Sequence, residues 1–429
     1  MSAIRDLLGI PEVRRRLAWT AALLVAFRIG SHISLPGVDP AAVEAFAASA
    51  SDAMGSAWAY LELLTGGALG RLALFSLGIG PYITASIAVQ LFAKASPALE
   101  AIAREGTAGR RIVEKYTRYA TAAVALLQAA FAASQLAGEA GPLLASRGPA
   151  TWIGLVAGMT AGALLVLWLA EQITERGLGN GPSVLILAGI VSRMPAALGE
   201  LAERVRAGDR GPDAIPLVVA AFLAAVVGTV FVSRAQRRLP LRSPKEVRGR
   251  RMTLGGASHL PLKLNAAGVM PVIFASALLV LPQVAALVPG LGGLRSLLAP
   301  GSFPATLLEL AAIVFFAYFW TYLFHRPSEI ALHLKENGTF IPGIRPGERT
   351  AEHLDRILVR LTLVGAAFLA VVAIAPGLAG RALGLERTFD VFLGGTGLLI
   401  VVGAAQDLAR KLEGHLLLRR TQGFLDRRR

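Results

Sequence analysis

Residues 214–233 read "AIPLVVAAFLAAVVGTVFVS", which is 20 consecutive positions without a charged side chain. An α-helix of roughly this length crosses the hydrocarbon core of a bilayer while it satisfies its own backbone hydrogen bonds. The whole chain has the same character, since 54% of its 429 residues are hydrophobic, 17% are charged and its mean hydropathy is +0.58. Soluble domains carry about 25% charged residues. The sequence therefore predicts an all-α polytopic membrane protein.

Ten apolar segments can be membrane spans if each span takes roughly 20 residues. Several are interrupted by Gly or Pro, which a membrane tolerates where neighbouring helices or water satisfy the backbone. The fifth is the weakest, since Arg193 and Pro195 fall near its end. The ten segments cover approximately residues 17–35, 74–93, 117–137, 152–170, 183–199, 213–233, 265–288, 304–324, 357–376 and 389–408.

The basic residues give the expected orientation. With ten alternating spans, the two termini and the even-to-odd loops share one side, and that side carries 33 of the 43 Lys and Arg residues. The opposite loops carry 9, and Arg28 lies inside the first span. Because Lys and Arg collect in cytoplasmic loops, we expect both termini in the cytoplasm. The acidic residues Asp6 and Glu12 argue against a cleavable signal peptide at the N-terminus.

Two segments on the basic side are long. Residues 234–263 hold nine basic residues against one acid, and "RRMTL" at 250–254 predicts a short hairpin. Residues 325–356 contain "FIPGIRPGER" at 340–349, where two Pro and two Gly predict a stiff, exposed loop. One interpretation is that both loops only fix the topology and touch anionic lipid. A rigid basic loop better suits docking of a large partner, either a protein or ribosomal RNA.

Residues 55–73, "GSAWAYLELLTGGALGRLA", are apolar but broken at Gly66 and Gly67, and they contain Glu62 and Arg71. The segment is too short and too interrupted to cross a membrane. One interpretation is an amphipathic helix that rests on the external surface. The other is a movable, half-inserted element, since non-helical backbone at membrane depth must be buried in protein or line a cavity.

The sequence offers no catalytic or metal-binding constellation. Its six His are scattered without metal-ligand spacing, and it has no Walker loop and no Gly-x-Ser-x-Gly motif. We therefore expect no enzyme activity and no cofactor. Carboxylates are almost absent from mid-span positions, which weighs against an ion-coupled transporter. Arg28 is the clear intramembrane charge, and its side chain is expected to turn inward or to snorkel.

Six well-separated motifs together resemble the SecY family of bacterial protein-conducting channels, and the likeness runs from end to end of the chain. The motifs are "LGIGPYITASIAVQL" (77–91), "EGTAGRRIVEKYTRY" (105–119), "WLAEQITERGLGNGPS" (168–183), "HLPLKLNAAGVMPVIFAS" (259–276), "FIPGIRPGER" (340–349) and "GGTGLLIVVG" (394–403).

The resemblance implies two inverted-repeat halves around a central hourglass pore. Residues 1–200 would carry spans one to five, residues 201–408 spans six to ten with cytosolic loops 234–263 and 325–356, and residues 409–429 a cytosolic basic tail. The segment at about 55–73 would be a plug helix beside the pore. Its plug residues would be Leu61, Leu63, Leu64, Gly66 and Gly67.

The resemblance also implies a ring of apolar side chains that closes the waist of the pore, since a dewetted constriction blocks ions. The matching residues are Ile79, Ile83, Ile186, Ile273 and Ile400, while the sixth family position falls on Pro182, with Leu185 as a neighbouring alternative. Taken singly, each Ile would indicate ordinary helix packing. Polar contacts across a lateral gate between spans two, three, seven and eight would come from Gln90, Gln128 and Asn265.

In this family, the loops after spans six and eight dock the SecA motor ATPase or the ribosome. The matching residues are Arg345 in the later loop and Arg250, Arg251, Arg237 and Arg238 in the earlier one. Other implied partners are SecE and SecG subunits, signal peptides, preproteins, membrane lipids and a second copy of the translocon.

The expected function is therefore the central channel of the Sec translocase in the bacterial plasma membrane. It would pass unfolded polypeptides across and release membrane segments sideways into lipid. The alternative is a secondary transporter of a small solute, a class that also uses inverted repeats and broken helices.

Overall fold

The computed structural model describes residues 11–39, 42–43, 62, 65–139, 148–208, 211–242, 246–248, 251–253, 257–272, 274–275, 302–383 and 395–426. The chain forms two compact units, one of residues 1–199 with 403–429 and the other of residues 200–402. Each unit has its own packed helices, and each is described by itself below.

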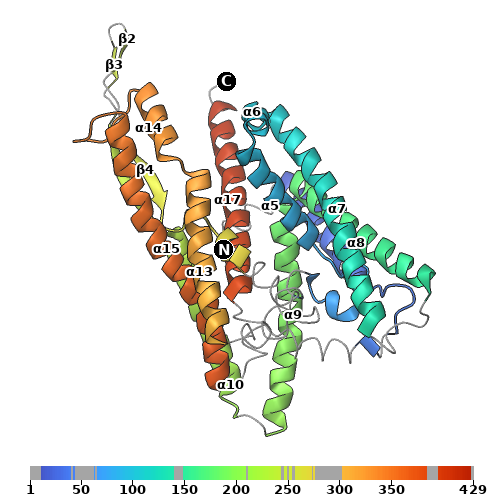
Figure 1. The fold of residues 1–429 in the computed structure, drawn as a ribbon. Helices are drawn as coiled ribbons and strands as arrows, with labels where there is room; N and C mark the ends of the chain where they lie inside the picture. Colours follow the sequence, from blue (N-terminus) through green and yellow to red (C-terminus); the bar gives the residue numbers. More distant parts are fainter. Residues whose placement is uncertain are drawn as a thin grey trace. The chain divides into compact units, whose positions relative to one another are not determined.

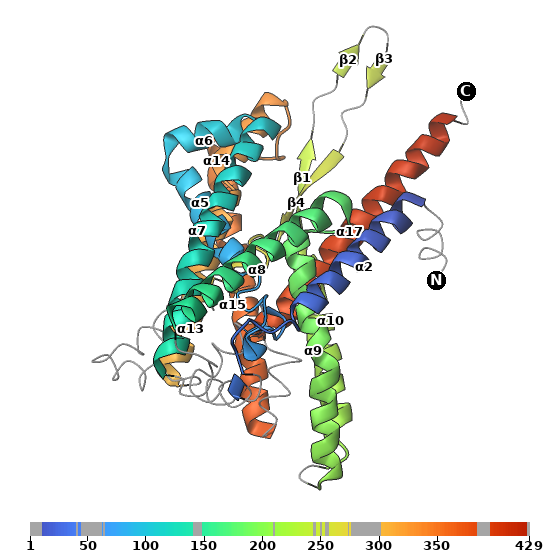
Figure 2. The same ribbon diagram turned by 90° about the vertical axis from the view of Figure 1, so that its right-hand side faces the viewer.

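The first unit consists of helices that pack along one another. Its elements are α2 (Pro11–Gly30), the short 3-10 helix η1 (Leu69–Arg71), α5 (Gly80–Ala95), α6 (Pro97–Arg104), α7 (Thr107–Glu139), α8 (Pro149–Arg176), most of α9 (Gly181–Arg206) and the C-terminal part of α17 (Gly395–Asp426). α5 lies against α7, and α8 lies against both α7 and α2 (Figure 1, Figure 2). α6 connects α5 to α7 along the chain and contacts both of them.

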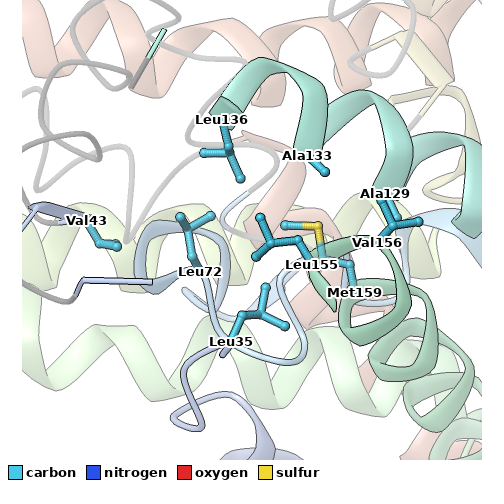
Figure 3. Packing of buried hydrophobic residues seen from close by; sticks show 9 residues of the cluster. All are labelled: Leu35, Val43, Leu72, Ala129, Ala133, Leu136, Leu155, Val156 and Met159. Carbon is cyan, nitrogen blue, oxygen red and sulfur yellow. The ribbon is translucent and has the colours of Figure 1, made fainter. Parts of the chain in front are cut away.

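Small residues let α7 approach its neighbours closely, as is common between transmembrane helices. Ala125, Ala129 and Ala133 recur every four residues on one face of α7, and all three are fully buried. Larger side chains from α8, from the segment before the predicted plug and from the end of the plug segment itself fill the space beside this face. In Figure 3 the cluster consists of Leu35, Val43, Leu72, Ala129, Ala133, Leu136, Leu155, Val156 and Met159.

The second unit combines three long helices with two small two-stranded antiparallel sheets. Its elements are α10 (Ala214–Arg234), β1 (Gln236–Arg242), β2 (Glu246–Arg248), β3 (Arg251–Thr253), β4 (Ala257–Lys263), α13 (Phe303–Phe324), α14 (Pro327–Glu336) and α15 (Glu348–Leu383). α13 and α14 both lie against α15 (Figure 1). Aromatic rings are concentrated on α13, where Trp320 contacts Phe274, Phe319 and Phe324 with ring centroids 5.0, 5.8 and 5.3 Å away.

Nine of the ten predicted spans contain a helix in the part of the chain that the structure describes. The seventh, 265–288, lies mostly outside the described residues. Among the described residues, five helical runs are long and apolar enough to cross a membrane: Pro149–Arg176, Gly181–Arg206, Ala214–Arg234, Phe303–Glu336 and Glu348–Gly380. The prediction of an all-α polytopic protein is confirmed, and the strands that the structure describes all lie in the basic segment 234–263.

Several helix boundaries differ from the prediction, and the starts of α5 and α15 show two causes. The second span was expected from residue 74, but α5 begins at Gly80 because residues 74–79 form turns, with Gly78 at a φ of 52°. Pro81 then occupies the first turn of α5, where its missing N–H costs nothing. The ninth span was expected from residue 357, whereas α15 begins at Glu348, directly after Pro346 and Gly347. Its added turns are buried against the sheet and not against lipid, as Leu354 illustrates with no exposed surface.

Candidate functional site

The two basic segments of the second unit build one structure. β1 and β4 pair in antiparallel register from Gln236↔Lys263 to Arg242↔Ala257. The backbone of Arg242 then pairs with Phe340 from the other segment, since each N–H donates to the other's carbonyl at 2.9 and 3.0 Å. β2 and β3 continue the hairpin, so the predicted short hairpin is confirmed and is longer than expected.

We call this structure the basic platform (residues 236–263 and 327–358), and a hydrophobic core holds its strands, its loop and the start of α15 together. Strand residues Leu239 and Leu241 alternate with exposed neighbours, which is the pattern of a sheet with one buried face. Their buried partners come from β4, from the 340–344 loop and from α15. The cluster consists of Leu239, Leu241, Leu262, Ile341, Leu354, Ile357 and Leu358.

The loop at 340–349 is stiff and exposed, as its Pro and Gly content predicts. Gly343 and Gly347 adopt φ values of 82° and 102°, which favour glycine. The Thr350 hydroxyl donates to the Arg345 carbonyl at 2.9 Å, and Thr350 itself is buried. Ile344 packs against the core of the platform while the neighbouring Arg345 is exposed. The guanidinium of Arg345 is therefore carried by a backbone that is anchored on both sides.

The other predicted docking residues lie on the hairpin. Arg237 and Arg238 are exposed on β1, and Arg251 opens β3, where its backbone pairs with that of Arg248. Arg250 lies outside the described residues. Arg237 and Arg238 directly precede the buried Leu239, so β1 supplies both a core contact and positive charge.

The segment predicted as a plug is largely buried within the first unit where the structure describes it, although Arg71 is exposed. Thr65, Ala68, Leu72 and Ala73 each keep 3% or less of their surface exposed. A helix that rests on an external surface would expose one face, so this burial favours the inserted interpretation. Gly66 and Gly67 have φ values of 64° and 83° and form the break that the sequence predicts. Leu61, Leu63 and Leu64 lie outside the described residues.

Polar contacts tie this segment to two helices of the same unit. A carboxylate oxygen of Glu62 lies 2.6 Å from the guanidinium of Arg193 on α9. Arg28 of α2 donates to the Gly66 carbonyl at 3.4 Å and to the Ser192 hydroxyl at 3.1 Å. Arg28 is thus turned inward, which was one of the two expectations for it. The sequence did not indicate that Ser192 is a partner of Arg28 or that Arg193 pairs with Glu62, although opposite charges in three apolar segments were a signal that could have suggested pairing.

The predicted ring residues divide between the two units. Ile79, Ile83 and Ile186 belong to the first and Ile400 to the second, and Ile273 lies outside the described residues. Ile79, Ile186 and Ile400 are buried, whereas Ile83 is partly exposed. The Ile83 N–H donates to the Ile79 carbonyl at 3.1 Å, so these two are one helical turn apart. The meeting of all five stays a prediction.

The lateral-gate residues likewise divide between the units. Gln90 on α5 and Gln128 on α7 are partly exposed in the first unit. Asn265 belongs to the second unit, where its side-chain amide donates to the Gly268 carbonyl at 2.9 Å. This local bond holds a turn at the start of the predicted seventh span, and contacts of these residues across a gate stay a prediction.

A further contact network that the sequence did not suggest fixes the loop between α8 and α9. The Thr20 hydroxyl of α2 accepts from the Leu178 N–H at 2.9 Å, and the Lys411 ammonium of α17 donates to the Gly179 carbonyl at 2.7 Å. A Cβ at Gly177 would lie 2.5 Å from the Thr20 hydroxyl, so glycine is needed there for the close approach. Both ends of the chain therefore stabilise this loop.

Within the described part of the chain, no three His, Asp or Glu side chains are grouped so that they could hold a metal ion. What the site offers is an exposed basic platform in one unit and a buried, broken segment beside charged side chains in the other. These features suit binding and conduction better than bond-making chemistry.

Comparison with known proteins identifies this arrangement. The SecY family model matches residues 73–409. The protein translocase subunit SecY of Aquifex aeolicus is 37% identical over 432 residues, which cover 99% of each chain. A solved SecY structure, described as having a plug domain that stabilises the closed state of the translocation channel, has a TM-score of 0.58 at 19% identity and covers 95% of this chain and 96% of its own. Sec61 in a canine ribosome–channel complex has a TM-score of 0.57 at 17% identity, with the same coverage of both chains.

Fold and site together define a multi-pass helical membrane protein of the channel class, which is not an enzyme. The chain belongs to the SecY family.

Proposed function

We propose that this chain is the central channel subunit of a Sec preprotein translocase, which conducts unfolded polypeptides across the plasma membrane and releases membrane segments sideways into lipid. The observation that carries the proposal is the burial of the broken segment 65–73 inside the first unit. Irregular backbone within a membrane protein is tolerated where it is enclosed by protein or lines a cavity, as a plug would be.

Closure of the channel is assigned to the ring of Ile79, Ile83, Ile186, Ile273 and Ile400, with the plug on its external side. Residues 1–200 and 201–408 act as two halves that part around the polypeptide, and Gln90, Gln128 and Asn265 make polar contacts at the lateral gate. Hydrogen bonds between transmembrane helices are worth on the order of 0.6 kcal/mol on average, so such a gate opens at small cost. Aliphatic ring side chains can part around a peptide and then exclude water again.

The basic platform is the docking site for a cytosolic partner, either the SecA motor ATPase or the ribosome. Its support is the exposed Arg345 on an anchored loop, together with the exposed Arg237 and Arg238 on the hairpin. A guanidinium in a fixed position can bind carboxylate or phosphate in bidentate fashion. The canine Sec61 of similar fold is part of a ribosome complex, which agrees with this role.

The proposed topology follows the charge distribution. With 33 basic residues on the side of the termini and of both platform segments against 9 on the other, both termini and the platform face the cytoplasm of a bacterial cell. SecE, SecG, signal peptides, preproteins and surrounding lipids are the other proposed partners, and a second translocon is a further one.

A secondary transporter of a small solute is the weaker candidate. Broken helices suit that class as well, but a stiff basic platform has no obvious use in a carrier of small solutes, and the family relationship favours the channel.

The test of the proposal is reconstitution of the full chain with SecE and SecG in vesicles, followed by addition of SecA, ATP and a labelled preprotein. The expected result is ATP-dependent protection of the preprotein from external protease. Protection that is no greater than in vesicles without this chain, from a preparation that is folded by circular dichroism, would contradict the channel function.

A further inference from the structure

The turn that begins the described part of the plug segment carries a mostly buried ion pair to which the proposed function assigns no role. Glu62 places a carboxylate in an otherwise apolar segment, and only 15% of its side chain is exposed. A carboxylate removed from water is costly unless it is paired. Its partner Arg193 comes from α9, a helix whose remaining residues near this point are apolar or small.

The backbone of the turn is closed by its own hydrogen bonds. The Gly67 N–H donates to the Glu62 carbonyl at 2.9 Å, and the Thr65 hydroxyl donates to the same carbonyl at 3.2 Å. The Leu69 N–H in turn donates to the Thr65 hydroxyl at 3.3 Å. The backbone carbonyl of Glu62 is therefore bonded to both Thr65 and Gly67, so a force on the Glu62 carboxylate is transmitted to these two residues.

Close packing brings this turn against two helices. A Cβ at Gly66 would lie 3.0 Å from the Gly189 Cα of α9 and 3.6 Å from the Phe27 ring of α2. The stem of Arg193 lies beside Gly67, where a Cβ would be 3.8 Å from the Arg193 Cδ. Glycines at these positions thus let the turn approach both helices closely enough for charged groups to meet.

The second cation connects the same three elements. Arg28 of α2 donates both to the Gly66 carbonyl and to the hydroxyl of Ser192, the residue next to Arg193. Ser192 itself donates to the Gly189 carbonyl at 2.8 Å, within α9. Two arginines from two different helices therefore hold one turn, one through its carboxylate and the other through its backbone.

We propose that Glu62, Arg193 and Arg28 form a latch that holds the plug segment in its closed position, with the Glu62–Arg193 ion pair as its main bond. This inference rests on the proposed channel function and assigns Arg28 and Arg193 as positioning residues for the plug. The pair acts as a latch because its two charges sit on parts that must separate when the plug moves. Part of the pair is exposed, so water can solvate both charges once they are apart.

The latch has a direct structural test that does not depend on transport. The chain contains no Cys, so Ala68→Cys introduces a single thiol at a position of the same segment that has no exposed surface. We expect this thiol to react slowly with a water-soluble maleimide in the otherwise unchanged protein. In the same background, Glu62→Gln and Arg193→Gln should each raise the labelling rate about 3- to 10-fold, as expected for loss of a partly buried ion pair.

Coupling between the two residues separates a latch from general loosening. The double variant Glu62→Gln with Arg193→Gln should label no faster than the faster single variant, because the second substitution removes a bond that is already lost. The charge-swapped variant Glu62→Arg with Arg193→Glu should return the rate to within about twofold of the starting protein. Arg206→Gln, an exposed arginine at the end of the same helix, is the matched control and should have no effect.

Single-channel recording of the same variants tests whether the latch affects closure of the channel. Glu62→Gln and Arg193→Gln should open spontaneously more often when idle, while preprotein translocation continues. Unchanged labelling and unchanged idle current in both single variants, or additive effects in the double variant, would overturn the latch. A starting protein that never translocates preprotein would instead overturn the proposed function, and the labelling rates would still decide whether the latch exists.

Discussion

At the scale of single residues, the structure shows how a flexible side chain acquires a fixed place. Arg345 is exposed, but its backbone carbonyl is held by the buried hydroxyl of Thr350 and its neighbour Ile344 packs into the platform core. The sequence predicted the stiffness from Pro and Gly. It could not predict the hydrogen bond from the Thr350 hydroxyl to the Arg345 carbonyl, because a threonine near the start of a helix can bond to several different backbone groups.

We expect Arg345→Glu to reduce SecA-driven translocation by about tenfold or more, because truncation of a central interface residue typically costs about 2 kcal/mol or more and charge reversal adds repulsion. Reconstituted vesicles with SecA and a labelled preprotein would measure this effect. Lys335→Glu, an exposed basic residue on α14 of the same platform, is the control and should change the rate little. Equal losses for both variants would mean that only net charge matters.

Thr350→Val should loosen the loop without emptying the space that the side chain fills. Loss of one hydrogen bond that satisfies a carbonyl costs about 1 kcal/mol, so amide hydrogen exchange of residues 345–351 should speed up about fivefold. Peptides from α13 provide the internal reference, and they should exchange as before. Exchange that is unchanged in the loop would show that packing of Ile344 alone fixes it.

At the scale of the elements, periodicity and composition predicted that nearly all the long helices exist, because each is an apolar run of sufficient length. The residues at which helices begin and end were harder to predict from the sequence. α5 starts six residues later than expected, since Gly78 and Pro81 govern its first turn, and α15 starts nine residues earlier, since its first turns bury leucines against a sheet that forms from distant residues. Tertiary contacts decide where such helices begin, and a local sequence pattern does not reveal these contacts.

Close contact of α8 with the segment before α5 provides a prediction at this scale. Gly162→Ala should destabilise the protein, because the added Cβ would lie 1.8 Å from the Leu74 carbonyl oxygen and the backbones would have to separate. We expect a fall of several degrees in the melting temperature in detergent, as overpacking typically costs about 1–3 kcal/mol.

Gly154 is the matched control on the same helix, since a Cβ there would meet nothing within 4 Å. Gly154→Ala should leave the melting temperature unchanged or raise it slightly, because alanine favours a helix over glycine by up to about 1 kcal/mol. If both variants melted alike, the tight approach at Gly162 would not be important for stability.

At the scale of the whole molecule, the order of the six motifs and the uneven distribution of basic residues were the strongest sequence signals for a SecY-like channel, and the family relationship agrees with them. The latch at Glu62 could not be predicted from the sequence. Arg28, Glu62 and Arg193 are separated by 34 and 131 residues along the chain, and only the fold decides which of the many possible partners each charge meets. The predicted ring poses the same problem with five residues instead of three.

The ring offers the prediction that involves the entire channel. Ile83 and Ile273 come from spans two and seven, and on the proposed function they face the same constriction in the closed state. Asparagine at both positions would place polar groups where a dewetted gap normally blocks ions, so water should enter more readily. We expect Ile83→Asn with Ile273→Asn to raise small-ion conductance of the idle, reconstituted channel severalfold, while circular dichroism stays that of a helical protein.

Val227→Asn on α10, where the side chain is 66% exposed, is the control for added polarity alone and should leave the conductance unchanged. An idle current equal to that of the unmodified channel in the double variant would mean that these two isoleucines only pack helices, and the seal would then have to lie elsewhere along the pore.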